Sequence, residues 1–215
     1  MKIGVLGTGM VGRAIGGKLV ALGHDVMMGS RTADNPAAMA WATHHGAKQG
    51  TFADAAAHGE LVFHCGKGEH ALAIAMAARP GLAGKILVDL TNPLDFSKGM
   101  PPTLSVCNDD SLGERLQAAM PEVKVVKTLN TLNCELMVAP GKLVEATTIF
   151  VSGDDLEAKA KVRALLTEGF GWRDVIDLGD ITTARGVEMW LPLWIRLWGA
   201  LGNADFNLRV VRAKP

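Results

Sequence analysis

Short apolar runs alternate with longer alanine-rich or amphipathic segments along most of the chain. The short runs end at glycine or polar residues and predict strands at residues 3–6, 25–28, 61–64, 85–90, 123–126, 147–151 and 175–178. The segments between them predict helices at residues 10–22, 35–45, 51–59, 69–78, 111–120, 154–167 and 180–201. Continuously apolar strands that alternate with helices indicate a mostly parallel sheet covered on both faces. We therefore expect an α/β protein.

Two segments depart from this alternation. Residues 91–107 form the longest stretch without periodicity, and loops of that length are often functional. The last predicted helix carries Trp190, Trp194 and Trp198 at intervals of four residues, which places them on one face. That face can be core, a dimer contact or a platform for a planar ring, and Pro192 should kink the helix.

The length and charge limit the classes of function. The chain has 215 residues, with 22 lysines and arginines against 22 aspartates and glutamates. A net charge of zero gives no electrostatic reason to expect nucleic acid or an anionic membrane as a partner. Tyrosine is absent, which excludes a tyrosine general acid. We see no leader or membrane-spanning segment, and three widely spaced cysteines suit reduced thiols, so we expect a cytoplasmic protein.

A glycine pattern follows the first predicted strand. The residues Gly7, Thr8, Gly9, Met10, Val11 and Gly12 match G-x-G-x-x-G and lead into a helix. In this context the first glycine permits the turn, the second admits a pyrophosphate, and the third lets helix and strand pack closely. The helix N-terminus offers N–H groups to phosphate. The pattern predicts a dinucleotide-binding Rossmann domain, with a glycine-rich structural turn as the alternative.

The end of the second predicted strand indicates which dinucleotide binds. An NAD site carries an acidic residue there, but Asp25 lies at the opposite end of this strand. Ser30 takes the place of the acid and Arg31 follows it. A hydroxyl beside a guanidinium suits the 2′-phosphate of NADP(H), because guanidinium groups bind phosphate through paired, charge-assisted hydrogen bonds.

Acid–base candidates are few. His64, Cys65 and His70 follow the third of these strands, and they could form a metal site or a cysteine nucleophile with a histidine partner. The spacing lacks a fourth ligand, so we prefer a segment in which Cys65, Gly66 and Lys67 lie along the dinucleotide. A site without a clear acid or base suits direct hydride transfer between two organic cofactors. We expect no metal.

Several motifs, in the same order along the chain, resemble those of the NADPH-dependent coenzyme F420 reductases and their relatives, including the flavin-using domain of membrane metalloreductases. The matching stretches span nearly the whole chain: residues 7–12, 22–26, 29–31, 69–71, 125–131, 151–155, 184–188 and 191–193.

This resemblance implies a Rossmann domain with a small C-terminal part that closes over the cleft. We place the boundary between residues 1–178 and 179–215, and expect the C-terminal helix to form a homodimer contact. By similarity, NADP(H) contacts Thr8, Met10, Val11, Ser30 and Arg31, and nicotinamide meets the second ring near residues 66–68, 92–93 and 130. The full set of expected cofactor-binding residues is Gly7, Thr8, Gly9, Met10, Val11, Gly12, Ser30, Arg31, Cys65, Gly66, Lys67, His70, Asn92, Pro93 and Asn130.

The chain also departs from the family pattern. Asn35, Lys67 and Asn130 stand where a family member has lysine, proline and histidine, and Asn130 is more similar to the flavin-using branch. The resulting hypothesis is hydride transfer between NADP(H) and either the deazaflavin coenzyme F420 or a flavin. An NADPH-dependent flavin or ferric reductase and a non-catalytic NADP-binding redox sensor remain alternatives. The physiological direction is left open.

Overall fold

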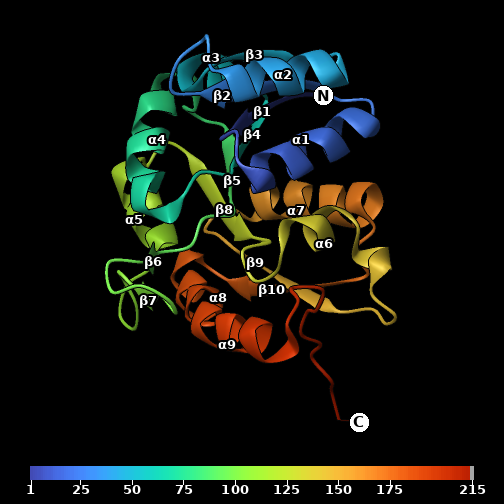
Figure 1. The fold of residues 1–215 in the computed structure, drawn as a ribbon. Helices are drawn as coiled ribbons and strands as arrows, with labels where there is room; N and C mark the ends of the chain where they lie inside the picture. The colour runs from blue at the N-terminus through green and yellow to red at the C-terminus, as the bar shows by residue number, and fades with distance from the viewer. Residues whose placement is uncertain (214–215) are drawn as a thin grey trace.

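A single large sheet organises the computed structural model, which describes residues 1–213. Eight strands lie in the order β10-β9-β8-β5-β4-β1-β2-β3 (Figure 1). The order β3-β2-β1-β4-β5-β8 is all parallel and matches the doubly wound Rossmann arrangement, whereas β9 runs antiparallel to β8. The strands are β1 (Lys2–Leu6), β2 (Asp25–Ser30), β3 (Lys48–Thr51), β4 (Leu61–His64), β5 (Ile86–Asp89), β8 (Lys124–Thr128), β9 (Thr148–Ser152) and β10 (Asp174–Gly179).

Helices cover both faces of the sheet, as the two flanks in Figure 1 show. One core holds side chains from α1 (Met10–Ala21), α2 (Pro36–His45), α6 (Cys134–Val138) and α7 (Leu156–Ala164). The other core holds side chains from α3 (Phe52–His58), α4 (Ala71–Ala78), α5 (Leu112–Ala119) and α8 (Ala184–Met189). Ile3 and Val5 of β1 point into the first core and Leu6 into the second. Burial on both sides explains why these strands are apolar without alternation.

Local sequence signals place several helix starts. Asn35 accepts a hydrogen bond from the Ala38 N–H, and Pro36 occupies the first turn of α2, where no backbone N–H partner is lost. Thr51 and Asp54 form a reciprocal capping box at α3. Side-chain caps of the same kind stand at Ser111 before α5 and Asp155 before α7. The predicted starts of these four helices are thus confirmed to within a residue or two.

Three elements were not predicted. Strand β3 has the polar sequence Lys-Gln-Gly-Thr and so lacks the apolar run that predicts a strand. It lies at the edge of the sheet, where a strand needs little apolar surface. The five-residue helix α6 is too short to show a period. Within the aperiodic stretch 91–107, β6 (Leu94–Asp95) and β7 (Thr103–Leu104) form a small antiparallel hairpin. Short 3₁₀ turns also stand at Gly68–His70, Arg79–Gly81, Pro140–Lys142 and Ile181–Thr183, and a π-helical turn at Leu165–Phe170 extends α7.

The single helix predicted over residues 180–201 is wrong. The segment divides into α8 and α9 (Leu191–Leu201), which meet at Trp190. Pro192 lies in the first turn of α9, where its missing N–H costs no hydrogen bond, so it begins a helix rather than kinking one. The predicted division of the chain at residue 178 stays a prediction.

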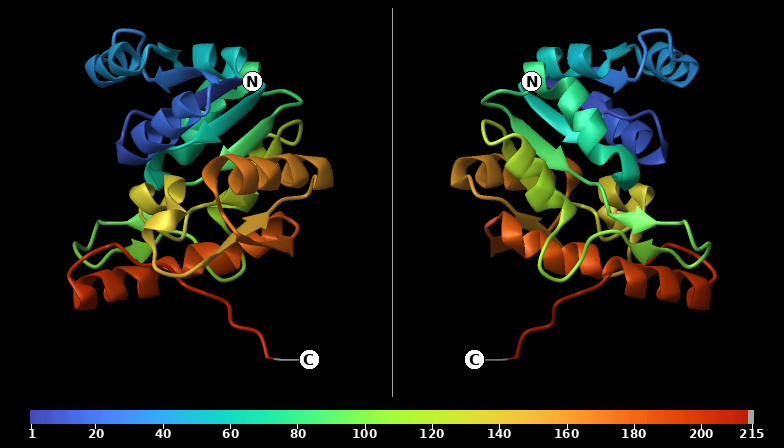
Figure 2. Two further views of the ribbon diagram at one scale, coloured as in Figure 1. Left: turned by 90° about the vertical axis from the view of Figure 1, so that its right-hand side faces the viewer. Right: turned by 90° about the vertical axis from the view of Figure 1, so that its left-hand side faces the viewer.

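None of the three tryptophans of the predicted face is fully buried. Trp190 and Trp194 are half-buried and Trp198 is 43% exposed, whereas Leu191 and Ile195 are the buried residues of α9. The Trp194 ring packs against Trp198 and against Phe206 of the C-terminal segment, with ring centroids 5.9 and 5.4 Å apart. That segment then extends away from the sheet, as both views in Figure 2 show.

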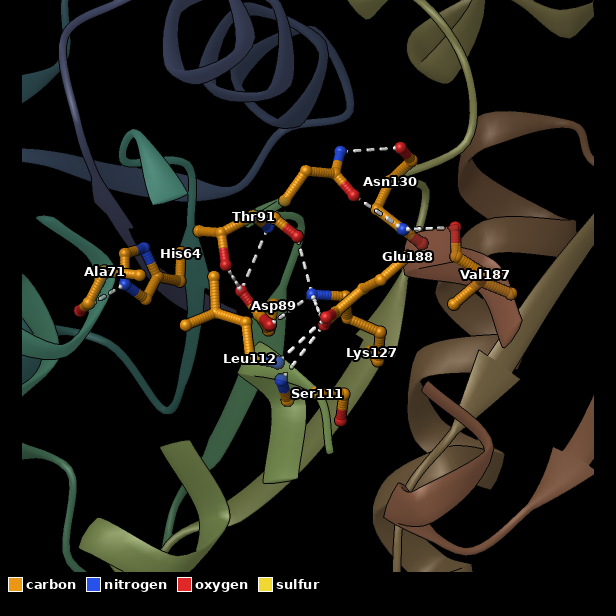
Figure 3. Close-up of polar contacts among 12 residues, drawn as sticks. His64, Ala71, Asp89, Thr91, Ser111, Leu112, Lys127, Asn130, Val187 and Glu188 are labelled. Carbon is orange, nitrogen blue, oxygen red and sulfur yellow. Dashed lines mark hydrogen bonds and ion pairs between the residues drawn. The ribbon is translucent and has the colours of Figure 1, made fainter. Parts of the chain in front are cut away.

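A buried ionic cluster joins the sheet to the C-terminal helices (Figure 3). The Lys127 ammonium of β8 lies 2.8 Å from Asp89 Oδ2 of β5 and 2.7 Å from Glu188 Oε1 of α8. It also donates to the Thr91 carbonyl at 2.5 Å, so that all three N–H donors have acceptors. Glu188 in turn accepts hydrogen bonds from the Leu112 and Gly113 N–H groups at the start of α5. One cation thus links β5, β8, α8 and, through Glu188, α5.

The charges in this cluster support one another. Burial alone would raise the pKa of Asp89, but the Lys127 charge holds that pKa below its ordinary value of 3.8. Burial alone would lower the pKa of Lys127, but the two carboxylates hold that pKa above its ordinary value of 10.5. The two carboxylates exceed the single ammonium by one charge, and the positive end of the α5 dipole compensates for it.

Lys127→Met should lower the free energy of unfolding by about 3–5 kcal/mol at pH 7, because two buried carboxylates lose their cation. A carboxyl group with a depressed folded pKa stabilises the protein above its unfolded pKa and loses that effect as the pH falls. The difference in free energy of unfolding between wild type and Lys127→Met should therefore become smaller below a pH of about 4, near the ordinary pKa of Asp89.

Urea titrations at several pH values measure this difference. Lys124→Met is the matched control, since Lys124 lies on the same strand and pairs with Asp155 at the surface. Lys124→Met should lower the free energy of unfolding by less than about 1 kcal/mol. A Lys127→Met protein as stable as the control at pH 7 would contradict the expectation.

Candidate functional site

The carboxyl ends of the central strands converge at one edge of the sheet. The chain leaves β1 toward α1 on one face and leaves β4 toward α4 on the other. The strand order therefore reverses between β1 and β4, which is where ligands bind in open α/β sheets. The residues directly after β1, β2, β4, β5 and β8 include most of the cofactor-binding residues expected from sequence.

The three glycines of the first turn have three different environments. Gly7 has a φ of 123°, a conformation that other residues rarely adopt. A Cβ on Gly12 would lie 2.0 Å from the Gly7 carbonyl oxygen, so only glycine lets α1 start this close to β1. A Cβ on Gly9 would meet no atom within 4 Å. The loop is tight at both ends and open in the middle, which fits a pyrophosphate at Gly9 and the α1 N-terminus.

The other residues of this turn differ in exposure. Met10 is exposed at the first position of α1, whereas Thr8 and Val11 are half-buried. The Arg13 guanidinium donates to the Thr8 carbonyl at 3.1 Å, which places a cation beside the loop. The structure thus brings the six motif residues into one turn between β1 and α1.

The end of β2 has the predicted polarity. Ser30 is the last residue of the strand and its hydroxyl donates to the Thr32 carbonyl at 2.5 Å. Arg31 is exposed and forms no ion pair with any residue between 1 and 213. Asp25 lies at the amino end of the strand, where it binds Lys48 at 2.8 Å. No carboxylate therefore takes the position from which an NAD site binds its ribose.

A cavity of about 360 Å³ opens beside Arg31. Its other walls come from Phe52 at the start of α3 and from His70 and one face of α4. The lining residues are Arg31, Phe52, His70, Ala73, Ile74 and Ala77. His70 was predicted from sequence, whereas Phe52 and Ile74 were missed because only the fold brings them beside Arg31.

The segment after β4 is locked by a buried histidine. His64 Nε2 lies 2.9 Å from the Ala71 carbonyl, and the Gly66 N–H donates to His64 Nδ1 at 3.3 Å (Figure 3). Both ring nitrogens are therefore used in the neutral form, and burial lowers the pKa of His64 further. His64 holds the Cys65–Gly66 turn against the start of α4.

The structure describes the surroundings of the residues named for the two chemical alternatives, a metal site and a cysteine nucleophile. Cys65 is buried, and burial followed by the nearby Asp89 charge raises the pKa of its thiol, so it is a poor nucleophile. Because His64 uses both nitrogens inside the fold, His64, Cys65 and His70 do not converge on an ion. Over residues 1–213, no three histidine, cysteine, aspartate or glutamate side chains are grouped as metal ligands.

The segments after β4, β5 and β8 meet at one point. Lys67 is exposed, while a Cβ on the neighbouring Gly68 would lie 1.7 Å from the Asn92 carbonyl oxygen. The Asn92 side-chain N–H donates to the Asn130 carbonyl at 2.8 Å, and the Asn130 side-chain N–H donates to Asn92 Oδ1 at 2.9 Å. Pro93 is buried next to this pair. Residues 66–68, 92–93 and 130 thus lie at one junction of loops, defined here as the amide junction. The expectation that the two cofactor rings meet near these residues stays a prediction.

Further cavities lie at both edges of the sheet. One of about 600 Å³ lies beside Gly68, between the β6–β7 hairpin and the starts of α4 and α5, and is lined by Leu72, Phe96 and Arg115 among others. A second, of about 670 Å³, lies at the amino ends of the strands near Glu60 and Lys124. The cavity near Glu60 is on the edge opposite the glycine turn. Of these two cavities, the one beside Gly68 adjoins the amide junction.

Comparisons with known proteins agree with this geometry. Residues 2–93 match the family model described as NADP oxidoreductase, coenzyme F420-dependent. A solved structure from Arthrobacter sp. FB24, named as a candidate F420-dependent NADP reductase, is 55% identical with a TM-score of 0.94. The match covers 99% of this chain and all of that one.

More distant relatives share the fold. The metalloreductase STEAP3 of Rattus norvegicus is 30% identical over 198 residues, which are 90% of this chain but only 38% of that protein. An imine reductase from Aspergillus terreus, solved with NADPH4, has a TM-score of 0.66 at 21% identity, over 94% of this chain and 62% of that one. At this identity the likeness shows the fold alone.

None of the helices described in residues 1–213 has the length and hydrophobicity to cross a bilayer.

The resemblance to the F420 reductases drawn from the sequence is confirmed, by the family model over residues 2–93 and by the Arthrobacter structure over the full length. The chain is an NADP-dependent oxidoreductase and belongs to the coenzyme F420-dependent NADP oxidoreductase family.

Proposed function

We propose that the protein transfers hydride between NADP(H) and the deazaflavin coenzyme F420 at the amide junction. One observation carries this proposal: the buried titratable side chains next to the junction are already engaged within the fold, and Lys67 is an exposed cation at its border. His64 uses both ring nitrogens, and Asp89, Lys127 and Glu188 bind one another. A reaction that moves a hydride between two organic rings needs orientation and exclusion of water rather than a proton shuttle.

The dinucleotide fits the residues of the carboxyl edge. The open space at Gly9 and the start of α1 would take the pyrophosphate, with Gly7, Thr8, Met10, Val11 and Gly12 forming the turn. Arg31 would bind the 2′-phosphate, and the Ser30 hydroxyl would join it by exchanging its bond to the Thr32 carbonyl for one to a phosphate oxygen. The cavity between Arg31 and His70 would take the adenine. When bound, the nicotinamide supplies or accepts the hydride.

The nicotinamide end would lie at the amide junction. Cys65, Gly66 and Lys67 would border it from β4, Asn92 and Pro93 from β5, and Asn130 from β8. These groups are backbone amides, side-chain amides and a proline, which can orient a carboxamide ring without changing its charge. The cavity beside Gly68 is the nearest place for a second ring system.

A flavin acceptor is the second candidate. The 30% identity with a metalloreductase over nearly the whole chain favours it, as does asparagine at position 130. In that case the protein would be an NADPH-dependent flavin or ferric reductase. A non-catalytic NADP-binding redox sensor is the third, and the lysine at position 67 leaves it open.

Arg31→Ala should weaken NADPH binding by about 10- to 100-fold, which corresponds to the loss of charge-assisted hydrogen bonds. NADH lacks the 2′-phosphate, so its affinity should change by less than about twofold. Titration of nucleotide fluorescence gives both constants. Arg163→Ala, an exposed arginine on α7, is the control. Equal losses for the two nucleotides would contradict the NADP(H) assignment.

The acceptor is tested by mixing purified protein with NADPH and, separately, coenzyme F420, FAD or FMN. We expect the near-ultraviolet absorbance of NADPH to fall with F420. Oxidation only with a flavin would favour the reductase of the metalloreductase type. A protein that binds NADPH but oxidises it with no acceptor would be a sensor, and the proposed hydride transfer would be wrong.

We further propose that the protein is a cytoplasmic homodimer with small-molecule partners rather than nucleic acid or a membrane. Support comes from apolar side chains that the C-terminal helices leave at the surface: Met189, Leu193, Trp198 and Leu201 are 38–54% exposed. Large apolar side chains left exposed on two consecutive helices favour a contact between subunits.

Light scattering should therefore give twice the mass of the chain. Leu193→Glu should halve that mass, because it places a charge within this apolar surface. Leu156→Glu is the control, since Leu156 is also exposed but lies on α7. A wild-type monomer would overturn the dimer proposal.

A further inference from the structure

The Asn130 side chain is held in one orientation. Its amide nitrogen donates to Asn92 Oδ1 at 2.9 Å and to the Val187 carbonyl at 3.1 Å (Figure 3). Both N–H donors are therefore used, and the amide cannot rotate without losing two hydrogen bonds. The side-chain oxygen of Asn130 accepts no hydrogen bond from residues 1–213, so it is available to a ligand at the amide junction.

Each partner of Asn130 is fixed in turn by the ionic cluster. Lys127 donates to the carbonyl of Thr91, the residue before Asn92. The Thr91 N–H and hydroxyl both donate to Asp89 Oδ1, at 3.0 and 2.7 Å. The chain that leads from β5 to Asn92 is thus bound at three atoms by two members of the cluster.

The third member fixes the other partner. Glu188 directly follows Val187, and its carboxylate binds the Leu112 and Gly113 N–H groups at 2.8 and 3.0 Å. It also lies 2.7 Å from the Lys127 ammonium. The position of the Val187 carbonyl relative to Asn130 is therefore set from both sides, by α5 and by β8.

The backbone between Lys127 and Asn130 adds a constraint. Leu129 is buried and has a φ of 57°, which is unfavourable for a leucine. Such a conformation persists only where the surrounding structure over-determines it, and residues of this kind cluster at functional sites. The turn at Leu129 directs Asn130 toward Asn92 immediately after the strand that carries Lys127.

We propose that Lys127 and Glu188 are positioning residues for the hydride-transfer step, which they serve by fixing the Asn130 amide through Thr91, Asn92 and Val187. The inference rests on the proposed function. Neither side chain reaches the amide junction itself, so neither should contribute much to NADPH affinity. Their effect should fall on the rate of hydride transfer, because displacement of a reacting group by about 1 Å can cost about 100-fold in rate.

Glu188→Gln tests the proposal with little change in size. Glutamine can keep an oxygen at the Oε1 position, which faces Lys127 and the Gly113 N–H, but its amide N–H₂ then faces the Leu112 N–H donor, so α8 should shift. We expect single-turnover hydride transfer to fall by about 10- to 100-fold, with the NADPH dissociation constant within about threefold of wild type.

Lys127→Arg is the second variant. It keeps both ion pairs, but a planar guanidinium cannot reproduce the three bonds of the ammonium. Arg185→Gln is the matched control, because Arg185 also joins α8 to α5, through Glu114 at 2.6 Å, without touching the ionic cluster. Its hydride-transfer rate should match that of wild type.

Hydrogen–deuterium exchange separates this inference from the proposed function. With NADPH bound, exchange in residues 128–133 should increase in Glu188→Gln and Lys127→Arg but not in Arg185→Gln. A wild-type protein inactive with every acceptor would overturn the proposed function, and the exchange data would still decide whether the cluster fixes Asn130. A folded variant at either position with wild-type exchange and, in an active enzyme, a wild-type rate would overturn the positioning role.

Discussion

The neutralisation of one buried ammonium underlies the arrangement of this protein. An unpaired lysine on an interior strand of the sheet would be expensive to bury, and Lys127 is accommodated because two carboxylates and a carbonyl meet it from two segments, residues 89–91 and Glu188 of α8. Those segments are distant in sequence. The ion pairs therefore act as a three-way junction that ties the Rossmann sheet to its C-terminal helices.

The carboxyl edge of the sheet, which lies above the ionic cluster, is formed mainly by neutral groups. Glycine backbone, two asparagine amides and a histidine held in its neutral form make up most of it. The charged groups are Arg31 at the outer end, Arg13 beside the glycine turn, Lys67 at the border of the amide junction and the buried cluster beneath it. A dinucleotide carries its negative charge at the phosphates and its reactive ring at the other end, so this distribution suits it.

The sequence revealed the fold and the outer half of the site because their signals are local. Apolar runs, capping residues and the G-x-G-x-x-G turn each depend on neighbours within a few positions, and Ser30 and Arg31 follow directly from the end of β2. The inner half was different. Lys127 lay in a recognised motif, yet nothing along the chain indicated that it was buried or that Asp89 and Glu188 were its partners, 38 and 61 residues away.

The same distinction explains the errors in the predicted elements. The break at Trp190 escaped notice because residues on both sides are apolar and Pro192 is compatible with a helix start as well as a kink. Strand β3 was missed because its pairing with β2, rather than its own composition, makes it a strand. Long-range partners decide these features, and periodicity does not report them.

The ionic cluster also has a consequence for how this chain can change over time. Asp89, Lys127 and Glu188 contribute interdependent energies, so the effect of replacing one depends on which residues occupy the other two. Loss of Lys127 leaves two buried carboxylates without their cation, and loss of either carboxylate leaves buried N–H donors without their acceptor, whereas joint replacement by apolar residues can be close to neutral for stability. Among related chains these three positions should therefore vary together, as a set inherited or exchanged whole.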